Sequence, residues 1–149
     1  MYRHLLVATD GSELSERAVR SAALLAQHLA ARLTICYVCM PYRALVLPSF
    51  PYPSSVLLDE EGFKRQSEAR KQQVLEPAVA LALQHGVSAH TLSRANPHPW
   101  AGILEAADAI GADLIVLASH GYSGIAALLL GSETQKLLVH TSKPGLVVR

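Results

Sequence analysis

The chain has 149 residues, half of them hydrophobic, and its 13 Lys and Arg against 12 Asp and Glu give a formal net charge of +1. This length fits a single domain over residues 1–149, and the composition excludes a disordered chain. The charge lacks the basic surplus of a protein that binds nucleic acid mainly by charge. No apolar run is long enough for a membrane span or a signal peptide, so we expect a soluble, cytoplasmic protein without a membrane partner.

Short apolar runs alternate with amphipathic stretches along the whole chain. The predicted elements are, in order, strand 4–8, helix 12–30, strand 33–38, helix 59–85, strand 87–94, helix 100–110, strand 114–118, helix 132–140 and strand 144–148. Ser12 is the predicted N-cap of the first helix, and Gly111 follows the end of the third. Pro77 predicts a kink or break in the second helix, near residues 75–76. Residues 41–55 are rich in proline and predict a loop.

This order predicts an α/β fold with a parallel sheet and helices on both faces. In such folds, ligands bind beyond the carboxyl ends of the strands, where the strand order reverses. Two loops follow strands at that end, Thr9–Ser12 and Ser119–Ser132. We therefore expect the ligand site between these two loops.

Cys36 and Cys39 have the C-x-x-C spacing of a redox pair or half a zinc site. They lie in a predicted strand, where positions three apart face opposite sides of the sheet. A redox C-x-x-C normally opens a helix, and the sequence has no second cysteine pair to complete a zinc site. We interpret both as small buried hydrophobic residues.

The loop after the fourth strand combines glycines with hydroxyl side chains. Gly121, Gly124 and Gly131 expose bare backbone, and Ser132 is the predicted cap of the following helix. Free amides next to a helix N-terminus form an anion site, for which a phosphate is the natural guest. The alternative is that these glycines only shape a tight loop, and spacing alone leaves both interpretations open. The loop does not match a P-loop motif.

Several segments together carry a specific resemblance. They are residues 5–12, 111–116, 119–121, 129–132 and 144–148. Over essentially its whole length the chain resembles the universal stress protein (UspA) family. The resemblance implies a Rossmann-like five-stranded parallel sheet of order 3-2-1-4-5, similar to that of the adenine nucleotide α-hydrolases. It also implies a homodimer, for which the apolar edge strand with Leu146, Val147 and Val148 is the expected interface.

One branch of the family binds ATP through the pattern G-x-x-G, nine residues, then G-[ST]. Gly121 and Gly131-Ser132 match this pattern, and Ala118 replaces its first glycine. The resemblance places Asp10 near the ribose, the Val38 backbone near the adenine, and Ser132 and Thr134 near the phosphates. The implied nucleotide-binding residues are Ala8, Thr9, Asp10, Val38, Ala118, Ser119, His120, Gly121, Gly131, Ser132, Glu133 and Thr134. The implied ligand is ATP, ADP or AMP, with Mg²⁺ arriving on the nucleotide near Asp10.

Three departures from this pattern predict modest binding. Ala118 adds a methyl group where the backbone should approach the nucleotide, and Glu133 brings a negative charge into the first turn of the last helix. The loop contains no Arg or Lys, although Lys136 follows one turn later and partly compensates. A family member that binds no nucleotide and acts as an interaction module is therefore the main alternative.

The sequence predicts no catalytic residues. Ser119 and His120 are neighbours whose side chains we expect to point apart, and the histidines are scattered, mostly on predicted surfaces. Slow nucleotide hydrolysis remains a second alternative, which needs Mg²⁺ bound with the nucleotide. Trp100 is either a stacking platform for a ligand or, as we expect, the start of a helix with its ring packed on the sheet.

Overall fold

A computed structural model describes residues 1–42, 59–120 and 130–149. Five parallel strands form one sheet in the order β3-β2-β1-β4-β5. The strands are β1 His4–Ala8, β2 Arg32–Cys39, β3 Ala89–Ala95, β4 Leu114–Ala118 and β5 Gly145–Val148. The described helices are α1 Glu13–Leu29, α3 Glu60–Gln84, α4 Pro99–Ala109 and α5 Ser132–His140. The predicted fold class, strand order and sequence of elements are confirmed.

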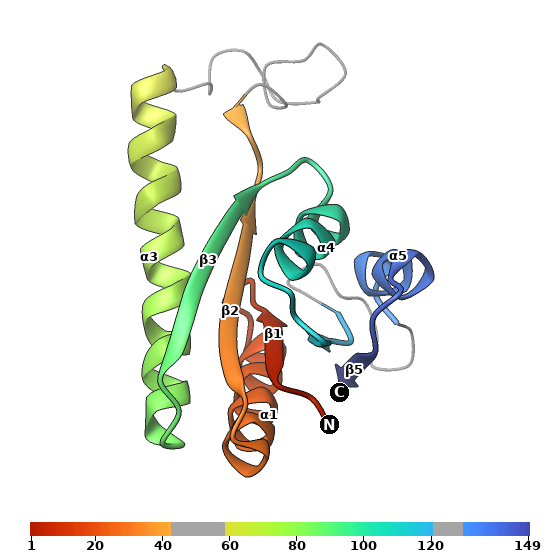
Figure 1. The fold of residues 1–149 in the computed structure, drawn as a ribbon. Helices are drawn as coiled ribbons and strands as arrows, with labels where there is room; N and C mark the ends of the chain where they lie inside the picture. Colours follow the sequence, from red (N-terminus) through yellow and green to blue (C-terminus); the bar gives the residue numbers. More distant parts are fainter. Residues whose placement is uncertain (43–58, 121–129) are drawn as a thin grey trace.

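The sheet separates two hydrophobic cores, with α1 and α3 on one face and α4 and α5 on the other (Figure 1). Successive strand residues point to opposite faces, so Leu5 and Val7 pack with α1 and α3. Leu6 between them packs on the other face, with Ile115 and Leu137. The central strands are therefore apolar on both sides, as expected for strands covered by helices on both faces.

Local signals at the helix ends behave as predicted. Ser12 caps α1, and its hydroxyl accepts a hydrogen bond from the Ser15 amide at 3.3 Å. Gly111 follows the C-cap of α4 with φ +63°, a left-handed conformation that a side chain disfavours. These signals depend on a few neighbouring residues, so the sequence reveals them directly.

Of the kink or break predicted near Pro77, the break is wrong, because α3 continues through it as one helix. Pro77 cannot donate a hydrogen bond to the carbonyl of Gln73, but both residues are exposed, so water reaches that carbonyl. Buried neighbours on the opposite side, including Val74 and Ala78, hold the helix against the core. Packing on both sides of the proline therefore offsets the lost hydrogen bond.

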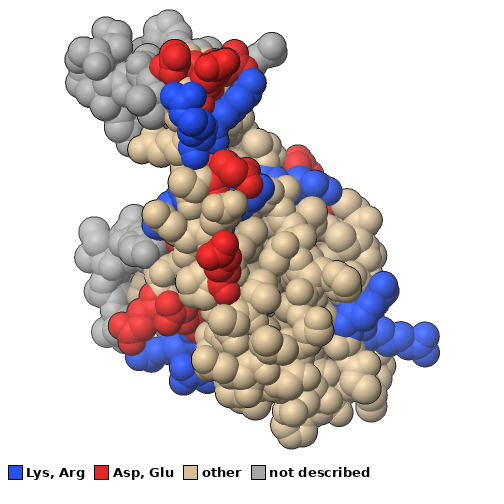
Figure 2. All heavy atoms as spheres, turned by 90° about the vertical axis from the view of Figure 1, so that its left-hand side faces the viewer, with Lys and Arg blue, Asp and Glu red and all other residues tan. Residues whose placement is uncertain are grey.

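The amino-terminal half of α3 carries most of its charge. Ion pairs join Glu60 with Lys64, Glu61 with Arg65 and Glu68 with Lys71. Figure 2 shows acidic and basic side chains gathered at the top of the face that looks outward from α3, with a mostly uncharged surface below. None of the helices in the described ranges is both long and apolar enough to cross a membrane.

The two cysteines are free thiols on β2, and the predicted burial holds for Cys36 but not for Cys39. Cys36 is buried in the core beneath α4 and α5, and burial raises its pKa to about 12. Cys39 is half-buried, and its thiol donates to the Arg94 carbonyl at 3.5 Å. Cys36 and Cys39 border different cavities, which agrees with opposite directions on the strand. Most of the predicted proline-rich loop, residues 43–55, lies outside the described residues.

A buried histidine lies at the amino-terminal end of the sheet, although the sequence predicted that the histidines lie mostly on the surface. His4 is 6% exposed. Its Nδ1 donates to the Ile110 carbonyl at 3.1 Å, and in the neutral ring Nε2 accepts from the Thr34 hydroxyl at 2.9 Å. Burial, with a smaller effect of Arg32, lowers the pKa of His4 and favours this neutral form.

Candidate ligand-binding site at the carboxyl ends of the strands

A cavity of about 340 Å³ opens where β1, β2 and β4 end. Its walls come from these strands and from α1, α4 and α5. The chain leaves β1 toward α1 on one face and leaves β4 toward α5 on the other, which makes this the point where the strand order reverses. The two loops singled out by the sequence therefore meet here, as predicted.

Hydrogen bonds hold the loop between β1 and α1 in one shape. The Asp10 carboxylate accepts from the Ser12 amide at 2.9 Å, and the Thr9 and Ser15 hydroxyls are 2.9 Å apart. Gly11 has φ +80° and donates its amide to the Thr9 hydroxyl at 3.2 Å. Thr9, Asp10 and Ser15 line the cavity, so it has a polar side that is already ordered.

The two ends of the glycine-rich loop approach each other closely at Gly131. Its amide donates to the Ser119 carbonyl at 2.7 Å. A Cβ at position 131 would lie 3.1 Å from that carbonyl oxygen and from the His120 Cα. Glycine therefore fits a close backbone contact within the protein that a larger residue would crowd. This supports the loop-shaping interpretation at this position, whether or not a phosphate also binds nearby.

Ser119 and His120 differ from the sequence expectation. Their side chains do not point apart, because Ser119 Oγ and His120 Nδ1 share a hydrogen bond of 3.1 Å. Ser119 is only 5% exposed and does not line the cavity, whereas His120 does. His120 therefore borders the cavity, whereas Ser119 stays buried.

The start of α5 also differs in detail. Ser132 is the first helical residue and not the cap; Gly131 occupies the cap position and offers no side-chain acceptor. Ser132 is exposed and does not border the cavity. The hydroxyl that does border it belongs to Thr134, which donates to the Ala118 carbonyl at 2.9 Å. The first turn of α5 is therefore fastened to the end of β4.

Glu133 joins α5 to α4. Its Oε2 accepts from the Trp100 amide in the first turn of α4 at 3.1 Å, and its Oε1 lies 3.3 Å from Lys136 Nζ. His98, at the cap position of α4, makes no side-chain cap bond, so Glu133 satisfies an amide there from a distant part of the chain. Trp100 packs on the core below, as expected, and its ring stacks on His140 with centroids 4.5 Å apart.

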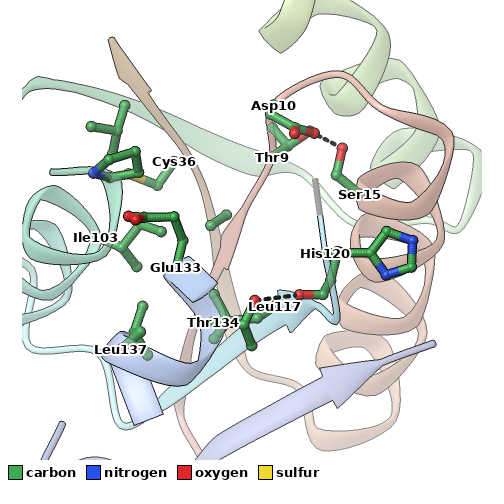
Figure 3. Close-up of a pocket in the computed structure, with 14 residues that line it drawn as sticks. Thr9, Asp10, Ser15, Cys36, Ile103, Leu117, His120, Glu133, Thr134 and Leu137 are labelled. Carbon is green, nitrogen blue, oxygen red and sulfur yellow. Dashed lines mark hydrogen bonds between the residues drawn. The ribbon is translucent and has the colours of Figure 1, made fainter. Parts of the chain in front are cut away.

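The other side of the cavity is apolar. Cys36, Val38, Pro99, Ile103 and Leu137 line it. Figure 3 shows Cys36, Ile103, Glu133 and Leu137 on one side of the view, and Asp10, Ser15 and His120 on the other. Gly102 allows this wall to form, because a Cβ there would lie 2.8 Å from Val38 Cγ1. Glycine lets α4 lie directly against the end of β2.

The structure brings eight of the twelve predicted site residues to the cavity wall: Ala8, Thr9, Asp10, Val38, Ala118, His120, Glu133 and Thr134. Ser119, Gly131 and Ser132 lie beside it without lining it, and Gly121 is outside the described residues. Sequence analysis missed six lining residues: Ser15, Cys36, Pro99, Ile103, Leu117 and Leu137. The helical spacing of Pro99 and Ile103 was a signal, since it places both on one face of α4.

The described residues hold no cluster of three or more His, Cys, Asp or Glu suited to a metal ion. Asp10 is the acidic residue at the polar side, and its carboxylate also accepts the Ser12 amide. One carboxylate fits a metal only as a partial ligand for an ion that arrives with a phosphate. In the described part of the chain, the cavity therefore has ordered polar groups at one side and no cluster of metal ligands.

A five-stranded doubly wound α/β domain with a cavity at its switch point is a common architecture for binding small ligands. The chain belongs to the universal stress protein family, whose model matches residues 1–149. It is 35% identical to universal stress protein YxiE of *Bacillus subtilis*, with full coverage of both chains.

Solved structures agree with this assignment. A universal stress protein in complex with cAMP is 30% identical, has a TM-score of 0.72 and covers 99% of this chain and 97% of its own. A universal stress protein from *Archaeoglobus fulgidus* in complex with dAMP is 20% identical, with a TM-score of 0.65 and coverage of 99% and 98%. The second likeness shows the fold alone.

Proposed function

We propose that this protein binds an adenine nucleotide in the cavity at the carboxyl ends of β1, β2 and β4. The observation that carries the proposal is the division of this cavity into an apolar side and an ordered polar side. Its volume of about 340 Å³ falls within the range of small-molecule sites. The cAMP complex of a relative that is 30% identical supports the same ligand class.

In this proposal the base lies against the apolar wall of α4. Val38, Pro99 and Ile103 supply a surface for a flat ring, and the Val38 backbone offers hydrogen bonds to its edge. The ribose lies near Asp10, and the phosphate lies toward His120 and the start of α5. An aromatic base buried on apolar side chains, with a few polar contacts for orientation, is the usual arrangement of such sites.

Calorimetry and thermal shift with AMP and ATP test this proposal. We expect saturable binding to the natural chain, which Ala118→Leu abolishes by filling the cavity. Ala80→Leu is the matched control, since it makes the same change at an exposed position of α3. Absence of binding by the natural chain would refute the proposal and favour the ligand-free interaction module. Mass spectrometry of small molecules released on denaturation identifies a co-purified nucleotide.

ATP with Mg²⁺ is the ligand that the family resemblance implies within this class, and slow hydrolysis is the extension of that alternative. In this extension Asp10, which lines the cavity, would be the protein group nearest a metal that arrives with the phosphates. Phosphate release that persists in Asp10→Ala would assign that activity to a contaminant. The proposed role is that of a cytoplasmic stress-response regulator which reports nucleotide occupancy to a partner.

We also propose a homodimer through β5. This strand forms one edge of the sheet and pairs with β4 on its other side. Leu146 is 38% exposed, and Val147 and Val148 are half-buried. Pairing two such edges covers apolar surface and unpaired backbone groups. Light scattering should give about twice 16.0 kDa, and Leu146→Lys should shift it toward the monomer; a monomeric natural chain would refute the dimer.

A further inference from the structure

The charged side chains at the cavity wall are mostly acidic, which is unusual for a site that would hold a polyphosphate. Among the described lining residues, Asp10 and Glu133 are acidic, no Lys or Arg is present, and His120 is the titratable base. Residues 121–129 contain no Asp, Glu, Lys or Arg in the sequence, so this segment adds no charged side chain. Among the described lining side chains, the fixed charges are therefore negative, which disfavours each further negative charge on a ligand.

Glu133 is the acidic residue that hydrogen bonds hold in a fixed place on the apolar side. Its carboxylate accepts from the Trp100 amide at 3.1 Å and pairs with Lys136 at 3.3 Å. Lys136 itself does not line the cavity, and its side chain is 50% exposed. The Glu133 side chain is 42% exposed, so water and salt screen both charges of the pair, but only the carboxylate borders the cavity.

Other basic groups are less well placed to compensate. The guanidinium of Arg70 lies 3.5 Å from the Asp10 carbonyl oxygen, but Arg70 comes from α3 and lines a different cavity together with Tyr37 and Gln73. Its charge acts on the polar side, away from the start of α5. The first turn of α5, where free amides would otherwise attract phosphate, thus carries its own carboxylate.

We propose that Glu133 is a specificity-determining residue that makes the cavity select adenine ligands of low charge, such as adenosine and AMP, over ATP. The inference rests on the proposed function and names the ligand class within it. Each further phosphate adds negative charge near a carboxylate that cannot move without uncapping α4. The same carboxylate accepts hydrogen bonds, so it accommodates donor groups such as a hydroxyl or an exocyclic amine.

Calorimetry with adenosine, AMP and ATP, in EDTA and at low salt, tests the selection. We expect the natural chain to bind ATP at least about fivefold more weakly than AMP, the effect of about 1 kcal/mol between two like charges at contact distance in water. Glu133→Gln keeps an acceptor for the Trp100 amide and removes the charge. It should strengthen ATP binding about fivefold and change adenosine binding less than about twofold.

Two further variants sharpen the result. Lys136→Gln removes the compensating charge and should weaken ATP binding while leaving adenosine binding unchanged. Glu60→Gln is the matched control, because Glu60 also lies in the first turn of a helix and pairs with a lysine of its own helix at 3.1 Å, outside the cavity. It should change no affinity. High salt should reduce the ATP effect of Glu133→Gln.

The outcomes separate this inference from the proposed function. If adenosine, AMP and ATP all bind, and Glu133→Gln changes their affinities equally, charge selection is refuted and nucleotide binding stands. Tighter binding of ATP than AMP by the natural chain also refutes the selection. If none of the three ligands binds the natural chain, the proposed function is refuted together with the selection.

Discussion

The polar groups at the two ends of the sheet are arranged in opposite ways. At the amino-terminal end, polar groups satisfy one another: His4 bonds Ile110 and Thr34, and the Asp113 carboxylate accepts the amides of Arg3 and His4. At the carboxyl-terminal end, polar groups of separate loops surround a cavity of about 340 Å³. Polar groups at one end of the sheet therefore pair with one another, and those at the other end border an open cavity.

The largest effect should come from the amino-terminal end. His4→Ala removes a buried ring and leaves the Thr34 hydroxyl and the Ile110 carbonyl without their partner. We expect a loss of about 2–4 kcal/mol in the free energy of unfolding, measured by urea denaturation. Ligand affinity of the folded variant should not change, because His4 lies at the far end of β1. A loss below about 0.5 kcal/mol would show that the network contributes little.

At the carboxyl-terminal end, Gly102→Ala should have a smaller effect on stability and a larger one on binding. The new Cβ would meet Val38 Cγ1 at 2.8 Å and push α4 away from β2. Crowding costs about 1–3 kcal/mol, partly offset by about 1 kcal/mol from the better helix propensity of alanine. Nucleotide affinity should fall because Val38 forms the wall. The control is Gly86→Ala, where φ is +74° and a loss of stability should leave affinity unchanged.

The pH dependence of folding stability should also originate at the amino-terminal end of the sheet. The pKa of His4 is lowered from 6.5 in the folded chain, mainly by burial and then by Arg32. As the pH falls below 6.5, the unfolded chain takes up this proton and the folded chain resists it, so stability is full above 6.5 and declines in more acidic solution. Urea midpoints in His4→Gln should show a weaker decline. An identical decline would assign it to other groups.

Protonation of Asp113 should cause a second, smaller loss of folding stability at lower pH. Burial alone would raise the pKa of its carboxyl, but the backbone amides of Arg3 and His4 that donate to it lower the pKa below 3.8. Stability is therefore full above 3.8 and is lost as the pH falls through the folded value. Because this carboxylate is largely solvated, the contribution is small. Asp113→Asn should flatten the curve in this range. Because the Asp113 carboxylate also raises the pKa of His4, the same variant should extend the His4 decline toward lower pH.

The smallest expected effect is slow reaction of the Cys36 thiol, which lines the cavity, with a thiol reagent. Burial raises the pKa of Cys36 to about 12, so its thiolate is scarce at pH 8. In Cys39→Ser, a thiol reagent should label the folded chain slowly and the unfolded chain fast. Rapid labelling of the folded variant would mean that the cavity opens further than its described walls indicate.

Much of this protein follows from its sequence because the determining signals are local. Apolar runs of strand and helix length, the Ser12 cap and Gly111 indicated the elements, and their alternation indicated a parallel sheet whose ligand site lies at the strand ends. The family resemblance added the strand order and most of the residues at the cavity wall. The break expected at Pro77 was wrong because core packing on both sides holds the helix.

Only the tertiary structure decided the contacts between residues that lie far apart in the chain. The Glu133 carboxylate meets the Trp100 amide, Thr34 meets His4, and Pro99 and Ile103 complete the cavity wall. Local pattern carries no information about which distant groups pair, since pairing depends on strand register and on how closely each helix approaches the sheet. The sequence by itself thus located the cavity at the strand ends, and packing determined which charges and surfaces line it.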